Sequence, residues 1–325
     1  KVILMKVAVL SLCVLLLVAA YASAAVLRGE NELVLNDEMI AHVNTHQNSW
    51  VAKRNERFEG MSVADVKKMM GVTKLPRKHP KSENTISGVS KAIPASFNAA
   101  ENWPHCADRI TNILNQEQCG SCWAFGATES LSDRMCIATN GAIDVQLSPQ
   151  SLVSCDIEGN MGCNGGIPHL AWDYMELAGV LSLECYPYTS GKGEKGQCSH
   201  TCTGSGNATV YKAKVLSTHG YADEHIQTAI MTDGPVEGTM EVYQDFMSYS
   251  SGVYKHTTGS LLGGHAIKII GWGHDATSNL DYWIINNSWG PTWGMKGVFW
   301  IVRGEDNCGI DHGAVAGLAN PNVSA

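Results

Sequence analysis

After its first two dozen residues the sequence lacks any apolar run long enough to cross a bilayer, so we expect a soluble mature protein without a membrane span. It also lacks internal repeats, which argues against a repeat architecture. Basic residues are scarce in the larger C-terminal part, because residues 92–325 hold 10 Lys and Arg against 23 Asp and Glu, a net charge of −13. That balance argues against nucleic acid as a partner. Cysteine is absent from residues 25–105, so any disulfide framework belongs to the later part of the chain.

The first 24 residues have the composition of a secretory signal peptide. Residues 7–20 are almost wholly apolar, and Ala22-Ser23-Ala24 provides a cleavage site of small residues. A membrane anchor fits less well because the apolar run is short. We therefore expect residues 1–24 to be removed in the secretory pathway. The ten cysteines that remain should then lie in an oxidising compartment, mostly as disulfides.

Residues 25–91 are predicted to form a separate leader. One helix is predicted after the capping residue Asn36, with Trp50 less regularly on its apolar side, and a second runs from Ser62 toward Met70. A polar stretch rich in Ser and Lys then ends the leader, as in an exposed linker that a protease can cut. Residues 1–91 carry a net charge of +5, so we expect electrostatic docking of the leader on the acidic body.

The body, residues 92–325, divides into two halves by its hydrophobic pattern. Helical patterns occur in the first half, to about residue 209, at 122–139, after Ser148-Pro149 and at 168–178. Short runs typical of strands dominate from about residue 210, at 265–270, 282–285 and 298–302, with one helix around 225–231. The sequence thus predicts an α+β fold with a cleft between a helical half and a β-rich half, a natural place for a site.

Cys119 and Cys122 stand three residues apart at the start of an apolar helical run. Such a pair can be half of a zinc site, a redox disulfide, or one structural cysteine beside one reactive cysteine. Zinc needs a second ligand pair, and a redox pair of the thioredoxin type needs a βαβ context that the sequence does not show. A free Cys122 at a helix N-terminus, near an imidazolium, is expected to have a lowered pKa. An inert packing cysteine is the alternative, which the flanking Gly120, Ser121 and Trp123 disfavour.

A reactive thiol needs a base and a group that orients the base. His265 follows two glycines and begins an apolar strand, and the preceding Gly264 permits close approach of a substrate backbone. Asn287 follows another strand and can accept a hydrogen bond from the second imidazole nitrogen. We therefore predict that Cys122, His265 and Asn287 meet in the cleft.

The chain resembles the papain family of cysteine proteases, and its cathepsin B branch in particular. Three features carry the family resemblance: the cysteine motif with an upstream glutamine, a glycine-rich turn, and the segments around the histidine and the asparagine. They are Gln116 with Cys119-Gly120-Ser121-Cys122-Trp123, Gly162-Cys163-Asn164-Gly165-Gly166, Gly264-His265-Ala266 and Asn287-Ser288-Trp289. Ser132-Asp133-Arg134, Gly234-Pro235-Val236-Glu237-Gly238 and Asn307-Cys308-Gly309-Ile310 favour the cathepsin B branch.

The resemblance implies a papain-like fold and a role for each matching residue. It makes Cys122 the nucleophile, His265 the general base and acid, and Asn287 the orienting group. Gln116 and the backbone N–H of Cys122 would form the oxyanion hole. Trp289 would shield the bond between Asn287 and His265. Substrate backbone would lie on Gly165 and Gly166, and Gly313 would stand at the base of the pocket for the second residue before the cleaved bond.

The resemblance also implies four disulfides and a leader that acts as an inhibitory propeptide. The implied pairs are Cys106–Cys136, Cys119–Cys163, Cys155–Cys198 and Cys185–Cys202, with Cys122 and Cys308 free. The propeptide would cross the cleft near Met69-Met70-Gly71. No metal or cofactor is implied. The expected partners are peptide and protein substrates, the chain's own propeptide and cystatin-type inhibitors, and the expected state is a monomer in a lysosome or other acidic vacuole, or outside the cell.

Three departures from the cathepsin B pattern bear on specificity. Only twelve residues separate Cys185 from Cys198, without the paired histidines of the occluding loop, so we expect an open cleft and endopeptidase activity. Gly313 replaces an acidic residue, so we expect apolar rather than Arg preference in that pocket. Glu117 replaces a glycine beside Gln116. The alternatives are a dipeptidyl carboxypeptidase, a catalytically silent binding homologue and a disulfide-rich structural protein. Asn207 and Asn322 begin glycosylation sequons.

Overall fold

The computed structural model describes residues 29–73, 92–219, 223–311 and 313–324. The predicted signal peptide and the linker at residues 74–91 lie outside this part of the chain. Among the described residues, no helix is both long and apolar enough to cross a membrane.

The described part of the leader includes helices α2 and α3, a short strand and a 3-10 turn. Helix α2 (Asp37–His46) begins after Asn36, whose side-chain oxygen accepts hydrogen bonds from the N–H groups of Glu38 and Met39. Helix α3 (Val63–Lys67) has the predicted capping box between Ser62 and Asp65. Strand β1 (Trp50–Ala52) and turn η1 (Glu56–Phe58) lie between the two helices.

Two details of the leader differ from the prediction. Trp50 is not on helix α2, which ends at His46, but in strand β1, where it is 2% exposed and donates from Nε1 to the carbonyl of Lys255. Helix α3 ends at Lys67, so Met69 and Met70 follow it in a turn, where their N–H groups donate to the carbonyls of Val66 and Lys67. In both places contacts with the body, which local sequence does not encode, decide the conformation.

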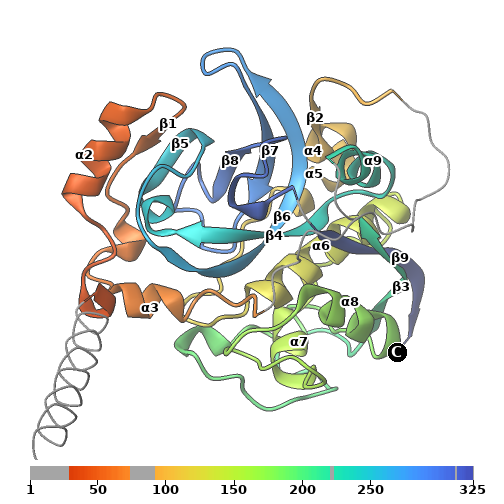
Figure 1. The fold of residues 1–325 in the computed structure, drawn as a ribbon. Helices are drawn as coiled ribbons and strands as arrows, with labels where there is room; N and C mark the ends of the chain where they lie inside the picture. Colours follow the sequence, from red (N-terminus) through yellow and green to blue (C-terminus); the bar gives the residue numbers. More distant parts are fainter. Residues whose placement is uncertain (1–28, 74–91, 220–222, 312, 325) are drawn as a thin grey trace, which may run out of the picture.

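The helical half of the body packs around one buried helix. Helix α6 (Cys122–Ala138) is buried along almost its whole length, including its polar residues Glu129, Asp133 and Arg134, because α7 (Pro149–Cys155), α8 (Pro168–Leu177) and the sheet surround it. Smaller elements precede or follow it: β2 (Phe97–Asn98), α4 (Ala99–Asn102), η2 (Pro104–Cys106), α5 (Ala107–Ile110) and η3 (Ser190–Lys192). Figure 1 shows α6 between α7 and α8 on one side and the strands on the other.

The β-rich half is built on a mostly antiparallel sheet. In its spatial order β1-β5-β8-β7-β6-β4-β9-β3, with β2 on β6, only the β5–β8 pair is parallel. The strands are β3 (Val210–His219), β4 (Val236–Tyr243), β5 (Tyr249–Tyr254), β6 (Leu261–Asp275), β7 (Leu280–Asn286), β8 (Val298–Val302) and β9 (Ala314–Ser324). Helix α9 (Asp223–Asp233) and turns η4 (Gln244–Ser248) and η5 (Asn307–Gly309) complete this half. The predicted strands and the helix near residues 225–231 are confirmed.

The leader extends this sheet. Strand β1 pairs antiparallel with β5, with Trp50 opposite Gly252, so the leader strand forms an edge of the sheet (Figure 1). The ring of Trp50 packs edge-on against Tyr254, with centroids 5.0 Å apart. Apolar contact and backbone pairing therefore hold the leader on the body.

The expected electrostatic docking takes a different form in the structure. Among the described residues, the ion pairs of Arg54, Lys67 and Lys68 are all made within the leader itself. These three side chains thus stabilise the leader's own turns. Arg57 is a leader cation that faces the acidic body, where it donates to the backbone carbonyl of Glu117, and the strand pairing and buried aromatic rings add to the attachment.

Candidate active site

The first helical residue of α6 is Cys122, a free cysteine that is completely buried. Its neighbour Cys119 forms a disulfide with Cys163, which joins the loop before α6 to the glycine-rich turn. Cys119 and Cys122 are therefore neither a zinc half-site nor a redox pair, and the third interpretation of the motif is the one found in the structure.

His265 lies on β6 and Asn287 directly after β7, two neighbouring strands. Nε2 of the imidazole lies 2.7 Å from Oδ1 of Asn287, so it donates to the amide oxygen. Nδ1 has no hydrogen-bond partner. The next residue, Ala266, hydrogen-bonds the Cys122 sulfur through its backbone N–H, so the part of β6 that carries His265 lies against the thiol. The arrangement leaves one nitrogen anchored and the other free to exchange a proton with sulfur.

Trp289 covers this pair. Its ring lies 4.8 Å from the imidazole of His265, centroid to centroid, and it is fully buried. On its other side lies Phe58 of the leader, edge-on at 5.2 Å. The hydrogen bond between His265 and Asn287 is therefore shielded from water in this state.

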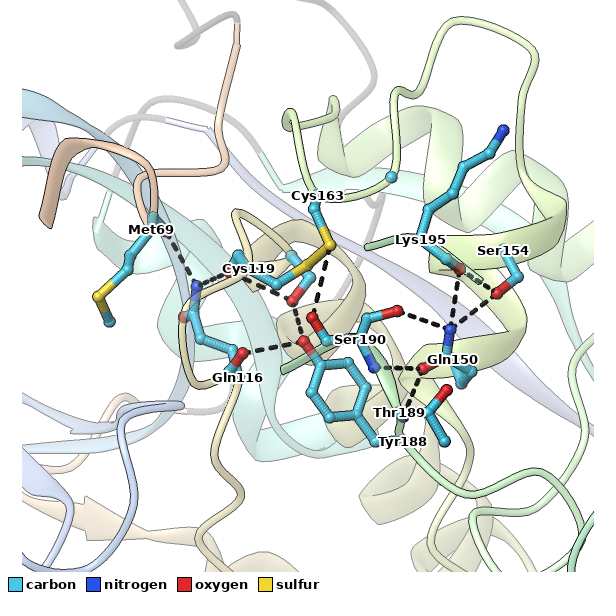
Figure 2. The surroundings of a disulfide bond; sticks show 12 residues. Met69, Gln116, Cys119, Gln150, Ser154, Cys163, Tyr188, Thr189, Ser190 and Lys195 are labelled. Atoms are coloured by element: carbon cyan, nitrogen blue, oxygen red, sulfur yellow. Dashed lines mark hydrogen bonds between the residues drawn. A yellow bond between two sulfur atoms is a disulfide. The ribbon is translucent and has the colours of Figure 1, made fainter. Parts of the chain in front are cut away.

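Gln116 brings a side-chain N–H to the same place. Its Nε2 donates to the carbonyl of Met69 in the leader at 2.9 Å and to the carbonyl of Cys119 at 2.7 Å (Figure 2). Its Oε1 accepts from the hydroxyl of Ser288 at 2.7 Å, and the two carbonyls that face Nε2 identify that end of the amide as the donor. The Met69 carbonyl thus occupies the position where a substrate oxygen can receive the Gln116 N–H.

The leader segment from Met69 to Thr73 fills the cleft. Val72 N–H donates to the Gly264 carbonyl at 3.0 Å, and Thr73 N–H donates to the Gly166 carbonyl at 3.1 Å. Gly166 N–H donates back to Gly71 at 2.8 Å. Gly71 lies so close to Gly120 that a Cβ there would meet the Gly120 oxygen at 2.2 Å and the Cys122 sulfur at 3.0 Å.

Among the other predicted residues, Gly165 adopts φ +104° beside Thr73, and Gly264 and Gly166 pair with the leader as described. Gly313, with φ +70°, directly precedes β9, which pairs with β4, the neighbour of the strand that carries His265. The prediction that the chain crosses the cleft near Met69-Met70-Gly71 is confirmed.

Burial sets the protonation of the covered site. It raises the pKa of the Cys122 thiol to about 12, against the opposing effect of hydrogen bonds from the backbone of Ala266 and Gly71. It lowers the pKa of the His265 imidazole to about 4, against the opposing effect of the Asn287 hydrogen bond. The expectation of a lowered thiol pKa is therefore wrong for this state. The leader excludes the water that would solvate an ion pair, and both groups are neutral at pH 7.

A tyrosine that the sequence did not suggest supports the loop of Gln116. The Tyr188 hydroxyl donates to the Gln116 backbone carbonyl at 2.9 Å (Figure 2). The same hydroxyl lies 2.9 Å from the Ser121 hydroxyl at the start of α6. Gln150 holds the following segment, because its Oε1 accepts from the backbone N–H groups of Thr189 and Ser190. Tyr188 is 66 positions after Cys122 and lies in a loop, so no local pattern points to it.

All four cysteine pairs implied by the resemblance are disulfides in the structure: Cys106–Cys136, Cys119–Cys163, Cys155–Cys198 and Cys185–Cys202. One group of metal-ligand type occurs among the described residues, formed by Cys155, Cys198 and His200. Two of its three sulfur and nitrogen ligands are already joined in a disulfide, so the group does not fit a metal site.

Comparison with known proteins agrees with this geometry. The model of the papain family cysteine proteases matches residues 93–318, more than half of the chain. The chain belongs to the papain family of cysteine proteases. The model of the family C1 propeptide matches residues 35–76, so the leader is the propeptide of a protease zymogen.

Similar proteins place the protease among cathepsin B-like enzymes. A cathepsin B-like cysteine proteinase of Schistosoma japonicum is 39% identical, over 87% of this chain and 91% of the relative. Cathepsin B of Dictyostelium discoideum is also 39% identical, over 86% and 90%. The solved structure of procathepsin B S9 from Trypanosoma congolense superposes with a TM-score of 0.81 at 30% identity, covering 90% of this chain and 100% of the other. The predicted papain-like α+β fold is thereby confirmed.

Proposed function

We propose that the protease is a cysteine-type endopeptidase in which Cys122, His265, Asn287 and Gln116 carry out catalysis. The observation that supports this most strongly is the Gln116 Nε2 bond to the Met69 carbonyl, next to a free cysteine and a histidine with one unpartnered nitrogen. A backbone carbonyl of the leader already accepts a hydrogen bond from the donor that a substrate carbonyl would use.

Each step follows from these positions. The Cys122 thiolate attacks the substrate carbonyl carbon, and the oxygen that becomes negative accepts hydrogen bonds from Gln116 Nε2 and the Cys122 N–H. Protonated His265 gives its Nδ1 proton to the leaving amine, and the C–N bond breaks to leave a thioester. His265 then takes a proton from water, which attacks the thioester and releases the acid. A donor of the Gln116 kind contributes on the order of 3 kcal/mol to transition-state stabilisation.

The leader keeps the site latent by covering it. With the leader seated, thiol and imidazole are neutral and inaccessible to water. Its departure lets water solvate the charged pair, and the dipole at the N-terminus of α6 then favours the thiolate. The active ion pair therefore forms only after the leader has left.

Endopeptidase activity is proposed because only twelve residues separate Cys185 from Cys198, which leaves little chain to close the cleft after the leader has left. In this segment η3 (Ser190–Lys192) packs beside the Gln116 loop, where Gln118 N–H donates to the Gly191 carbonyl. The segment contains no histidine to receive the C-terminal carboxylate of a substrate. A peptide can then extend past the site on both sides. A dipeptidyl carboxypeptidase would instead release dipeptides from C-termini and spare internal bonds.

The pocket beside the nucleophile is proposed to take apolar side chains. Val72 of the leader is buried there in a small apolar cluster with Cys122 and Ala266. Gly313 supplies no side-chain carboxylate toward a substrate arginine. Peptides with Phe, Leu or Val at the second position before the cleaved bond should be turned over faster than those with Arg, and a clear Arg advantage would contradict this.

An acidic compartment of the secretory pathway is the proposed location. Burial raises the pKa of Asp133 to about 6 and that of Glu129 to about 8, so these two groups make the folded state more stable at low pH than at neutral pH. The same environment would favour maturation, since protonation of the body's carboxylates weakens its attraction for the basic leader. Processing that is independent of pH and salt would contradict this part of the proposal.

The test uses the full chain after acid activation, titrated with an irreversible epoxide that reacts with thiols. One equivalent should label Cys122 and abolish peptide cleavage, while Cys122→Ser should take up no label. A silent binding homologue would show folded protein and leader release without cleavage. Labelling at Cys308 with retained cleavage would overturn the assignment of the nucleophile.

A further inference from the structure

Glu117 occupies a backbone position that usually suits glycine. Its φ is +54°, in the left-handed region, and its N–H donates to the Asn115 side chain at 3.0 Å. The next residue, Gln118, is tied to the carbonyl of Gly191. A glycine would adopt this conformation without strain, whereas a residue with a side chain incurs a conformational cost there. The presence of Glu117 at this position therefore suggests a use for its side chain.

The carboxylate of Glu117 lies on the rim of the cleft. A Cβ built on Gly191 would fall 2.1 Å from its Oε2, so the carboxylate rests directly on that glycine in the adjacent loop. The residue is exposed and directly follows Gln116. Glu117 thus places a negative charge on the wall of the cleft next to Gln116, the proposed oxyanion donor.

This wall belongs to the leaving-group side of the site. The leaving amine must take its proton from His265 and therefore lies next to the imidazole. Trp289 packs against that imidazole, so we expect substrate residues after the cleaved bond to run past Trp289. The leader marks the same side: Phe58 packs on Trp289, and Arg57 donates from Nη2 to the backbone carbonyl of Glu117 at 3.1 Å.

Arg57 shows that a cation fits against Glu117. Its guanidinium is partly buried there, and Nε has no hydrogen-bond partner. Burial lowers the pKa of Arg57 to about 10, and the negative charge of Glu117 opposes that shift. An arginine of the leader therefore approaches this wall, where the negative charge of Glu117 offsets part of the cost of burying the guanidinium.

We propose that Glu117 forms a subsite for a lysine or arginine side chain of the substrate on the leaving-group side, and that Arg57 of the leader occupies it in the zymogen. This deepens the proposed endopeptidase function and rests on it. The subsite would select internal sites followed by a basic residue, and its charge would repel the terminal carboxylate that a carboxypeptidase must accept.

The experiment compares the acid-activated full-chain enzyme with its Glu117→Gln variant on internally quenched peptides. The peptides carry Lys, Gln or Ala at the first or second position after the cleaved bond. Wild type should prefer Lys over Gln by roughly three- to fivefold in kcat/KM, the size expected of an exposed ion pair. The preference should disappear in Glu117→Gln and shrink as NaCl is raised. Glu176→Gln, which removes an exposed carboxylate on α8, is the matched control and should keep the preference.

An equal Lys-to-Gln ratio in wild type and Glu117→Gln would overturn the subsite while leaving the endopeptidase intact. Absence of cleavage by wild type would instead contradict the proposed function. A second measurement, independent of cleavage, is the thermal unfolding of the full chain with Arg57→Gln, Glu117→Gln and both. The two changes should be non-additive because either variant removes the electrostatic interaction between the Arg57 and Glu117 side chains. Strict additivity would overturn the assignment of Arg57 as occupant.

Discussion

Gly71→Ala should unseat the leader from the cleft while leaving most of the leader attached. The added Cβ would meet the Gly120 carbonyl oxygen at 2.2 Å and its carbon at 2.5 Å. Both atoms are backbone in the loop before α6, which is held by the disulfide of Cys119, so neither can yield cheaply. The leader segment must therefore move away from the thiol.

The magnitude follows from the hydrogen bonds that this movement breaks. Four N–H···O bonds join the segment to the cleft: Gln116 to Met69, Gly166 to Gly71, Val72 to Gly264 and Thr73 to Gly166. At a net value of about 1 kcal/mol each they contribute about 4 kcal/mol. Loss of all four would raise the fraction of molecules with an open site by about a thousandfold.

The assay is the rate at which the thiol-directed epoxide labels Cys122 in the unprocessed chain at neutral pH, followed by intact mass. The matched control is Gly29→Ala in the same leader, where an added Cβ has nothing within 4 Å. We expect fast labelling of Gly71→Ala and slow labelling of both Gly29→Ala and wild type. Equal protection of Gly71→Ala would refute the close-approach argument and the view that this segment makes the zymogen latent.

Two further predictions concern the body. Tyr188→Phe removes the hydroxyl that holds Gln116 and Ser121, so kcat should fall about tenfold with KM little changed, and binding of a peptide aldehyde, which forms an oxyanion, should weaken in parallel. The control is Tyr186→Phe, whose hydroxyl bonds Gln197 instead and which should behave as wild type. A change in KM alone would contradict the positioning role of Tyr188. Burial raises the pKa of Glu129 to about 8, so its stabilising contribution is complete below about pH 4.5 and is lost as pH rises toward 8, at up to about 1.4 kcal/mol per pH unit. The melting temperature of Glu129→Gln should therefore vary less with pH between 4.5 and 8 than that of wild type. Parallel curves of melting temperature against pH would show that Glu129 titrates normally.

Local rules in the sequence predicted the elements that local chemistry controls. Asn36, Ser62 and Ser148 each cap the helix expected after them, because a short polar side chain satisfies N–H groups within its own turn. The strands of the β-rich half were also predictable, since their branched and aromatic residues suit a buried sheet. Motif resemblance, rather than spacing, supplied the residues that meet at Cys122.

The misses lie where distant parts of the chain act on each other. Trp50 became a strand residue because the edge of β5 pairs with it, and that edge is about 200 positions away. The pKa of Cys122 is raised rather than lowered because the thiol is buried beneath the leader, and the cysteine motif carries no information about that burial. Tyr188 reaches Gln116 across a loop with no periodic pattern. Each depends on tertiary packing, which overrides local preference.

The continuity of the sheet between leader and body separates two events of maturation. A cut in the chain between them removes a covalent tether, yet the β1–β5 ladder and the buried Trp50 remain. The severed leader is then a bound inhibitor whose departure is a dissociation step, governed by concentration and by competing substrate. Once it has left, β5 becomes an open edge with unpaired backbone groups, able to accept another extended strand. Release of the leader therefore exposes an unpaired strand edge at β5 together with the catalytic cleft.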